Sequence, residues 1–219
     1  MTAISDRPTD VSAPPLDATD AIAVAGADAA TPEGNPGLIA LPLIIAGALG
    51  LGFTNTGIVD SGAAAVPILL SATAVGLLLA TIWAAALRQN VNATVYAVFF
   101  GFYGSYAVLS IGQTHNWFGI PSSGAQETTA LWLGSWLVTI TLLTVLLVRL
   151  PWTYPALLAV VDVALALLLI GTVADSRLAT QAGGVFVFGF VAFVVYYYAA
   201  ALWEETGGRA LPLGKPLVS

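Results

Sequence analysis

The chain has 219 residues, of which 58% are hydrophobic and 8% are charged, and its formal net charge is −6. A soluble domain of this size carries about 25% charged residues, so the composition indicates an integral membrane protein. The absence of cysteine, the single histidine (His115) and the six basic residues exclude disulfides, thiolate metal sites and a basic nucleic-acid surface. We therefore expect no metal, no cofactor and no nucleic-acid partner.

Residues 1–34 are expected to form a disordered acidic tail. The segment is rich in Ala, Asp, Thr and Pro, lacks aromatic residues, and sets six acidic side chains against Arg7 alone. Such a composition cannot bury enough apolar surface to fold. It also lacks the basic region and short apolar core of a secretory signal, so we interpret it as a solvated tail.

Six long apolar stretches follow, separated by short polar breaks. Each is close to the ~20 apolar residues that a helix needs to cross a hydrocarbon core. The expected spans are residues 38–53, 63–87, 93–111, 129–148, 155–173 and 185–203. This pattern predicts an all-α transmembrane domain over residues 35–205 and a C-terminal tail over 206–219. Strands of a membrane barrel would be about half as long and would alternate apolar and polar residues.

The segment Asn35-Pro36-Gly37 marks the expected start of the first span. Asn is favoured as an N-cap and Pro at the first helical position. Pro42 removes a backbone hydrogen bond further on, and free amides at the positive end of a helix dipole could meet an anion. The residues favour the cap and leave the anion site open.

Two short matches indicate a duplication of three helices. Pro67-Ile68-Leu69-Leu70 in the second span resembles Pro155-Ala156-Leu157-Leu158 in the fifth. Phe100-Gly101-Phe102 in the third span recurs as Phe188-Gly189-Phe190 in the sixth, and both pairs are 88 residues apart. Three-helix halves would have inverted topology, as in many transport proteins. The alternative is chance similarity between apolar segments.

Asp162 is the only ionisable side chain well inside a predicted span, and no Lys or Arg lies at similar depth. An ionised carboxylate there costs at least ~2.5 kcal/mol by insertion scales, so it should face water or a partner. Desolvation favours the neutral acid. We take Asp162 as a candidate for proton coupling. The alternative is a neutral carboxyl that forms hydrogen bonds to a helix backbone.

The six tryptophans and Tyr196 to Tyr198 mostly lie near span ends, where aromatic side chains anchor at the membrane interface. Five of the six basic residues fall on the side of the termini: Arg7, Arg88, Arg149, Arg209 and Lys215. Because cytoplasmic flanks collect Lys and Arg, we expect a multi-pass protein of the cytoplasmic membrane with both termini in the cytoplasm.

Four short motifs follow one another along the chain: Asn35-Pro36-Gly37-Leu38, Asn55-Thr56-Gly57, Tyr103-Gly104-Ser105, and Gly208 to Gly214. In this order they resemble the Asn-Pro-Ala-Pro-Leu-Gly-Leu signature, the Asn-x-Gly, the Tyr-Gly-Ser and the closing Gly-Arg-Thr-x-Leu-Pro-x-Gly of the acetate uptake transporters. This family is also called the succinate–acetate permeases. The second proline of the family's opening signature is missing here, with Leu38 in its place.

This resemblance implies a helical bundle with one pore in each subunit, assembled as a homo-hexamer in the lipid bilayer. It implies that the substrate pathway includes Asn35, Pro36, Asn55, Thr81 and Tyr103 as its polar and entrance residues. The family narrows its pore with Phe, Tyr and Leu, and the aligned positions here are Ile44, Tyr103 and Val161. Since only the tyrosine is kept, the constriction should be wider.

The leading hypothesis is therefore transport of acetate or another small carboxylate such as succinate, channel-like or coupled to protons. One alternative is a channel for small neutral solutes such as urea or amides, which would not need Asp162. The other is a membrane signalling or scaffold protein that transports nothing. An enzyme is not expected, because no second carboxylate and no mid-span His or Cys accompanies Asp162.

Overall fold

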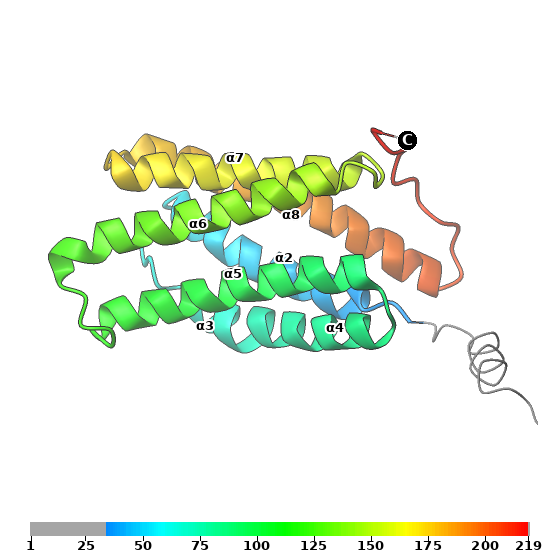
Figure 1. Ribbon diagram of the computed structural model, residues 1–219, viewed down its shortest axis with the longest axis horizontal. Helices are drawn as coiled ribbons and strands as arrows, with labels where there is room; N and C mark the ends of the chain where they lie inside the picture. Colours follow the sequence, from blue (N-terminus) through cyan, green and yellow to red (C-terminus); the bar gives the residue numbers. More distant parts are fainter. Residues whose placement is uncertain (1–33, 219) are drawn as a thin grey trace, which may run out of the picture. The chain divides into compact units, whose positions relative to one another are not determined.

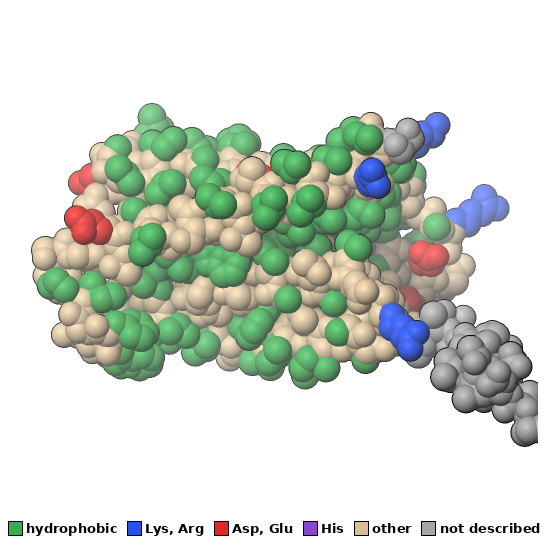
Figure 2. All heavy atoms as spheres, in the orientation of Figure 1, with side chains coloured by type: hydrophobic (Ala, Val, Ile, Leu, Met, Phe, Trp, Pro, Cys, Tyr) green, Lys and Arg blue, Asp and Glu red, His purple; other side chains and the backbone are tan. Residues whose placement is uncertain are grey.

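The computed structural model describes residues 34–218, so the predicted acidic tail lies outside the described residues except for Gly34. Within this range the chain forms helices and turns, with one isolated β-bridge between Pro151 and Pro216. Six helical segments are long and apolar enough to cross a membrane, which confirms the all-α membrane architecture. Apolar side chains cover the length of the bundle and charged side chains gather at its ends (Figure 2).

The six spans run up and down in chain order (Figure 1). They are α2 (Gly37–Asn55), the segment α3–η1–α4 (Val66–Ile68, Leu69–Ala74 and Val75–Ala86), α5 (Asn90–Thr114), α6 (Ala125–Leu146), α7 (Thr153–Val173) and α8 (Arg177–Glu205). The middle part of the second span, η1, is a π-helix, and a 3-10 turn, η2 (Ser122–Gly124), precedes α6. The start of α2 and the end of α8 lie at the same end of the bundle, called the termini end below.

Each of the last three spans starts 87 or 88 residues after its counterpart among the first three: Gly37 and Ala125, Val66 and Thr153, Asn90 and Arg177. Since each half holds three spans, the two halves cross the bundle in opposite directions. The matched helix starts support the duplication that the two sequence matches indicate. The packing is not symmetric. The backbones of α2 and α8 lie close together, whereas their counterparts α6 and α5 meet through large side chains such as Trp132 and Trp136.

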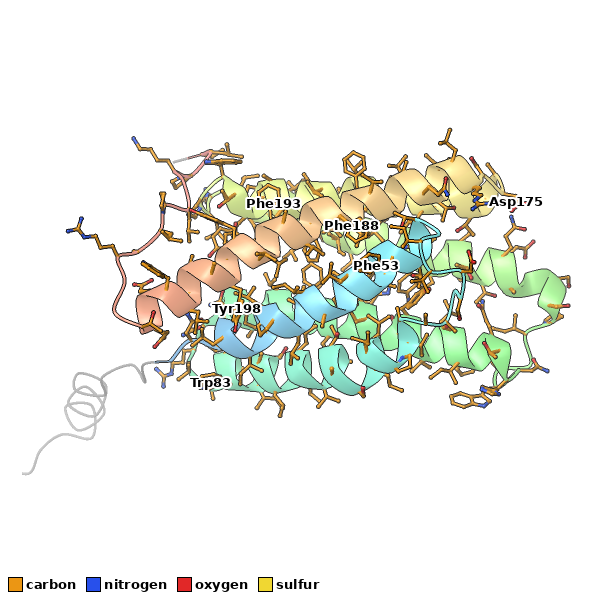
Figure 3. The ribbon with its side chains drawn as sticks, turned by 180° about the vertical axis from the view of Figure 1, so that it is seen from behind. Phe53, Trp83, Asp175, Phe188, Phe193 and Tyr198 are labelled. Carbon is orange, nitrogen blue, oxygen red and sulfur yellow. The ribbon has the colours of Figure 1, made fainter. Side chains whose placement is uncertain are left out.

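Helix α8 packs between α2 and α7, and α6 lies beside α7. Close contact between α2 and α8 depends on small residues. A Cβ atom at Gly184 would lie 2.8 Å from the backbone nitrogen of Thr56, and Gln181 Nε2 donates to the Thr56 carbonyl oxygen at 3.1 Å. Nearby, the rings of Phe53 and Phe188 meet edge to face with centroids 5.2 Å apart (Figure 3). These contacts fix the far end of α2, which carries Asn55, against α8.

The expected C-terminal tail returns to the bundle after α8. It contains no helix up to Val218, but the Thr153 hydroxyl donates to the Leu213 carbonyl oxygen at 2.6 Å. The backbone nitrogen of Trp152 donates to the Lys215 carbonyl oxygen at 2.9 Å. The end of the chain is therefore attached to the turn between α6 and α7.

Candidate functional site

A cavity of about 240 Å³, called the large cavity below, occupies the termini half of the bundle. Its walls come from α2, α5, α7, α8, the α6–α7 turn and the C-terminal segment. Most lining side chains are apolar, among them Leu41, Ile44 and Val194. A few polar groups are set into these walls, which is the usual make-up of a site for a small organic molecule.

Three tyrosines from three helices line the large cavity: Tyr96 of α5, Tyr154 of α7 and Tyr197 of α8. The rings of Tyr154 and Tyr197 stack with centroids 4.9 Å apart. The Tyr197 hydroxyl is buried close to the Thr153 hydroxyl, but it forms no hydrogen bond of good geometry among the described residues, because Thr153 donates to the Leu213 carbonyl oxygen instead. Because a buried hydroxyl without a partner costs about 1–3 kcal/mol, its presence here fits a solute that accepts a hydrogen bond.

Tyr197 corrects one expectation from the sequence. The run Tyr196 to Tyr198 predicts interfacial anchors, but Tyr197 is only 8% exposed and lines the large cavity. Successive residues of a helix point about 100° apart, so a run of three tyrosines cannot face one environment. Tyr196 is exposed and donates to the Pro212 carbonyl oxygen at 2.7 Å.

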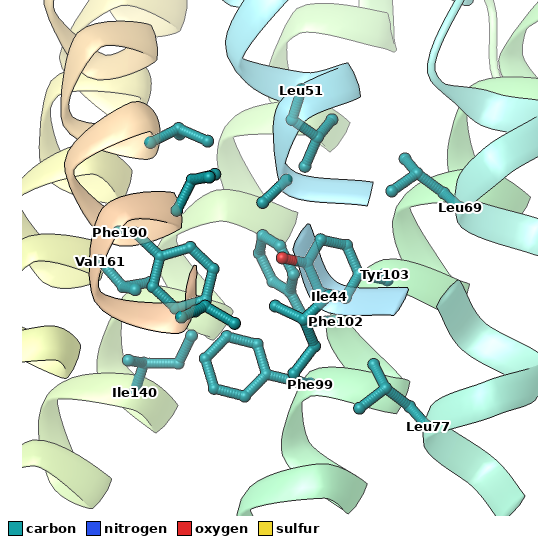
Figure 4. Close-up of a cluster of buried hydrophobic side chains, with 14 of the residues drawn as sticks. Ile44, Leu51, Leu69, Leu77, Phe99, Phe102, Tyr103, Ile140, Val161 and Phe190 are labelled. Atoms are coloured by element: carbon teal, nitrogen blue, oxygen red, sulfur yellow. The ribbon is translucent and has the colours of Figure 1, made fainter. Parts of the chain in front are cut away.

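A second cavity of about 40 Å³, the small cavity, lies toward the opposite end of the bundle. Only two residues line both cavities, Phe99 of α5 and Phe190 of α8. Their rings stack with centroids 5.6 Å apart and planes at 17° (Figure 4). This Phe99–Phe190 pair is therefore the neck between the two cavities.

The three positions aligned to a constriction lie around this neck (Figure 4). Ile44 lines the large cavity, whereas Tyr103 and Val161 line the small one. The expectation of a wider constriction did not include Phe99 and Phe190. These two rings, and not the side chain at position 44, lie between the two cavities.

The two asparagines of the motifs lie at opposite ends of α2. Asn35 lines the large cavity and Asn55 the small one. The helix begins at Gly37 with Pro36 as its N-cap, one residue later than the sequence predicts, and Asn35 Oδ1 accepts from the Gly37 nitrogen at 3.1 Å. Pro36 is fully buried beside Asn35 and is not among the residues that line the cavities.

Thr81 and Asp162 lie away from both cavities. The Thr81 hydroxyl donates to the Leu77 carbonyl oxygen of its own helix at 2.7 Å. The half-buried Asp162 carboxylate accepts from the hydroxyls of Thr141 at 3.1 Å and Thr144 at 2.7 Å, both on α6. Asp162 is therefore hydrogen-bonded, as the alternative expects, but its partners are threonine hydroxyls of a neighbouring helix and not the helix backbone.

Several lining residues were missed in the sequence although their spacing carries a signal. Tyr96, Phe99 and Tyr103 are separated by three and four residues and so share one face of α5, and Phe190 and Tyr197 are two turns apart on α8. In a helix that is apolar on all sides, the aromatic spacing alone does not say which face looks inward. The contact of the Phe99 ring of α5 with the Phe190 ring of α8 identifies it.

At the termini end, the large cavity continues into a wide polar mouth. Asn35, Asn92, Ala201 and Glu204 line both, and Glu205 lines the mouth. Among the described residues that line the cavities and the mouth, none is Lys or Arg. The described part of the chain also contains no group of three or more His, Asp or Glu side chains that could hold a metal ion.

Comparison with known proteins places this arrangement in a family. The solved structure of the bacterial acetate channel SatP has a similar fold, with a TM-score of 0.73 and 17% sequence identity. The match covers 84% of this chain and 100% of that chain. A search of curated protein sequences finds no significant match. The sequence model of the GPR1/FUN34/yaaH family matches residues 29–208. This agrees with the resemblance drawn from the four motifs, and the chain belongs to the GPR1/FUN34/yaaH family.

Proposed function

We propose that the protein conducts a small carboxylate such as acetate across the cytoplasmic membrane. The observation that carries this proposal is the pair of cavities that follow one another along the membrane-spanning bundle and meet at the Phe99–Phe190 neck. Membership of the GPR1/FUN34/yaaH family and the fold shared with an acetate channel support it. The solute would pass from the polar mouth into the large cavity, through the neck and into the small cavity.

The lining suits a solute with an apolar body and a head that accepts hydrogen bonds. Leu, Val and Phe side chains can contact a methyl group, while the hydroxyls of Tyr96, Tyr154 and Tyr197 can donate to the head. Sites for drug-sized ligands have volumes of roughly 300–1,000 Å³. At about 240 Å³, the large cavity is smaller than these and fits a small solute.

A channel for small neutral solutes such as urea is the second candidate. It is favoured by the absence of Lys and Arg among the described lining residues, because an anion at the neck would meet no opposite charge. Glu204 at the mouth also opposes anions. A carboxylic acid that crosses together with its proton is neutral, so it also needs no positive charge in the lining. Proton-linked transport of a carboxylate is therefore part of our proposal, and it does not require Asp162.

Uptake of labelled acetate into liposomes that contain the purified protein tests the proposal. Unlabelled succinate, lactate and urea serve as competitors, with and without a pH gradient. Uptake of labelled urea is measured in parallel, and protein-free liposomes measure leakage through the lipid. We expect acetate uptake that lactate reduces more than urea does. Uptake of urea but not of acetate would establish the second candidate instead. No uptake of any of these solutes would favour a protein that transports nothing.

A further inference from the structure

The chain after α8 forms a strap across the termini end of the bundle. Residues 211–216, called the C-terminal strap below, run back toward the α6–α7 turn, where Pro151 and Pro216 form a β-bridge. The Tyr196 hydroxyl of α8 donates to the Pro212 carbonyl oxygen at 2.7 Å. The Thr153 hydroxyl of α7 donates to the Leu213 carbonyl oxygen at 2.6 Å. The strap is thus held by side chains from two different helices.

The turn of the strap at Gly214 packs directly against the ring of Trp152. Gly214 has φ +88°, and a Cβ atom there would lie 2.3 Å from the Trp152 ring. Only glycine adopts this backbone conformation easily and leaves room for the indole. The backbone nitrogen of Trp152 donates to the Lys215 carbonyl oxygen at 2.9 Å. The strap therefore has one defined docked position, which Gly214 and the backbone hydrogen bond to Trp152 determine.

The strap is also part of the wall of the large cavity. Leu211 and Leu213 line it together with Tyr154 and Tyr197. The two residues that hold the strap, Thr153 and Tyr196, are the direct sequence neighbours of these two tyrosines. Movement of the strap would therefore change the size of the cavity and remove an apolar wall beside the tyrosine hydroxyls.

We propose that the C-terminal strap is a releasable wall that determines the size of the solutes reaching the large cavity from the termini end. When docked, its two leucines close the cavity between α7 and α8. When it is released, the entrance is wider and bulkier molecules pass. The strap can be released without unfolding a helix, because its attachments to the bundle are few and lie at helix ends. The proposal relies on the proposed function only for the identity of the solute.

The accessibility of one introduced thiol tests this proposal without any transport assay. The chain has no cysteine, so Ala200→Cys, which lines the large cavity but not its mouth, gives a single reactive group inside the cavity. Thr153→Val with Tyr196→Phe removes the two side-chain donors that hold the strap. The full-length purified protein is treated with a small thiol reagent and with a bulky maleimide, and both labelling rates are measured.

We expect labelling by the bulky maleimide to be about tenfold faster in the strap-release variant, since two modest hydrogen bonds are lost. Labelling by the small reagent should change much less. Thr172→Val with Tyr198→Phe is the matched control. Thr172 bonds within its own helix at the Leu168 carbonyl oxygen, and neither residue bonds the strap. Equal maleimide rates in the release and control variants, or an equal increase for both reagents, would overturn the proposal.

A protein that ends at Ala210 provides a second test, in which no helix residue is changed. Its melting temperature and its elution volume in gel filtration show whether the bundle still folds. If the folded, shortened protein labels with the bulky maleimide no faster than the full chain, the strap is not a wall. In liposomes it should transport large carboxylates better relative to acetate. A chain without any acetate uptake would contradict the proposed function but would leave the labelling result valid.

Discussion

At the residue scale, the main finding is that hydroxyl groups face an apolar cavity without being used by the fold. Tyr197 is the clearest case, because its buried hydroxyl lacks a partner among the described residues. A fold gains nothing from such a group. We propose that this hydroxyl serves a molecule that enters the cavity, and experiment can separate that role from stability.

The substitution Tyr197→Phe should leave the melting temperature unchanged or slightly raised, because it removes an unsatisfied hydroxyl and keeps the ring. The concentration of acetate at half-maximal uptake should rise about threefold to tenfold, the value of one hydrogen bond. Tyr198→Phe on the same helix is the control and should change neither quantity. A large loss of stability in Tyr197→Phe would show that the hydroxyl has a structural role.

The Phe99–Phe190 neck leads to a prediction about the size of the solutes that pass. Phe190→Leu should increase uptake of larger acids such as lactate and succinate relative to acetate, because it replaces one ring of the Phe99–Phe190 pair. A loss of stability of about 1–2 kcal/mol is expected from the smaller side chain. Phe193→Leu, a half-buried residue of α8 outside both cavities, should leave the ratio unchanged. An unchanged ratio in both variants would mean that the neck lies elsewhere.

Sequence reasoning identified part of this site. The motifs led to Asn35, Asn55 and Tyr103, which line the cavities. A motif identifies a residue by its sequence neighbours, so it does not require knowledge of the direction in which the side chain points. Phe99 and Phe190 were missed because both helices are apolar and contain several other aromatic residues, so nothing in the sequence distinguishes these two. Their importance comes from stacking across two helices 91 residues apart in sequence (Phe99 and Phe190), and periodicity within one helix cannot show such a pairing.

At the scale of helices, the contact between α2 and α8 positions both cavities. Gly184→Ala should destabilise the protein by about 1–3 kcal/mol, as overpacked substitutions do, because the added methyl group would meet the backbone of Asn55 and Thr56. Gly189→Ala is the matched control on α8, since its Cβ would have an ordinary contact with Val160 at 3.4 Å. The melting temperature of Gly184→Ala should fall while that of Gly189→Ala should not. Equal melting temperatures would contradict the close packing.

Helices α6 and α7 give a prediction about Asp162. Asp162→Asn should retain acetate uptake and its dependence on a pH gradient, because the side chain contacts Thr141 and Thr144 and lines neither cavity. The measurement is uptake at two internal pH values in wild type and variant. If uptake driven by the gradient is lost while the protein remains folded, the proton-coupling hypothesis for Asp162 is supported and our assignment is contradicted.

The sequence predicts that the six helices exist, but it predicts less well the residues at which they begin and end. All six spans were expected, because about 20 consecutive apolar residues leave few alternatives. Helix α8 nevertheless begins at Arg177, eight residues before the apolar stretch that starts at 185, since Ser176 caps it and polar residues continue the helix beyond the apolar part. The π-helical segment η1 was not predicted, because hydrophobic periodicity does not distinguish it from an α-helix. Within it, the Thr73 hydroxyl donates to the Leu43 carbonyl oxygen of α2 at 2.9 Å.

At the scale of the described bundle, two halves that cross it in opposite directions enclose the large and the small cavity, which form the path of our proposal. The path is asymmetric, with a large cavity and an acidic mouth at the termini end and a small cavity toward the other end. This asymmetry could not be predicted from the duplication, which by itself implies similar halves. It accompanies a difference in packing, because the backbones of α2 and α8 lie close together while α5 and α6 meet through the side chains of Trp132 and Trp136.

The most direct test asks whether acetate passes through the small cavity. Val161→Cys places a unique thiol in that cavity, and Val163→Cys places one on the exposed outer surface of the same helix. Both proteins are reconstituted in liposomes and treated with a small methylthiolating reagent, and mass spectrometry confirms the modification. Our account predicts that modified Val161→Cys loses most acetate uptake, that a reducing agent restores it, and that Val163→Cys is unaffected. Full uptake by modified Val161→Cys would contradict it.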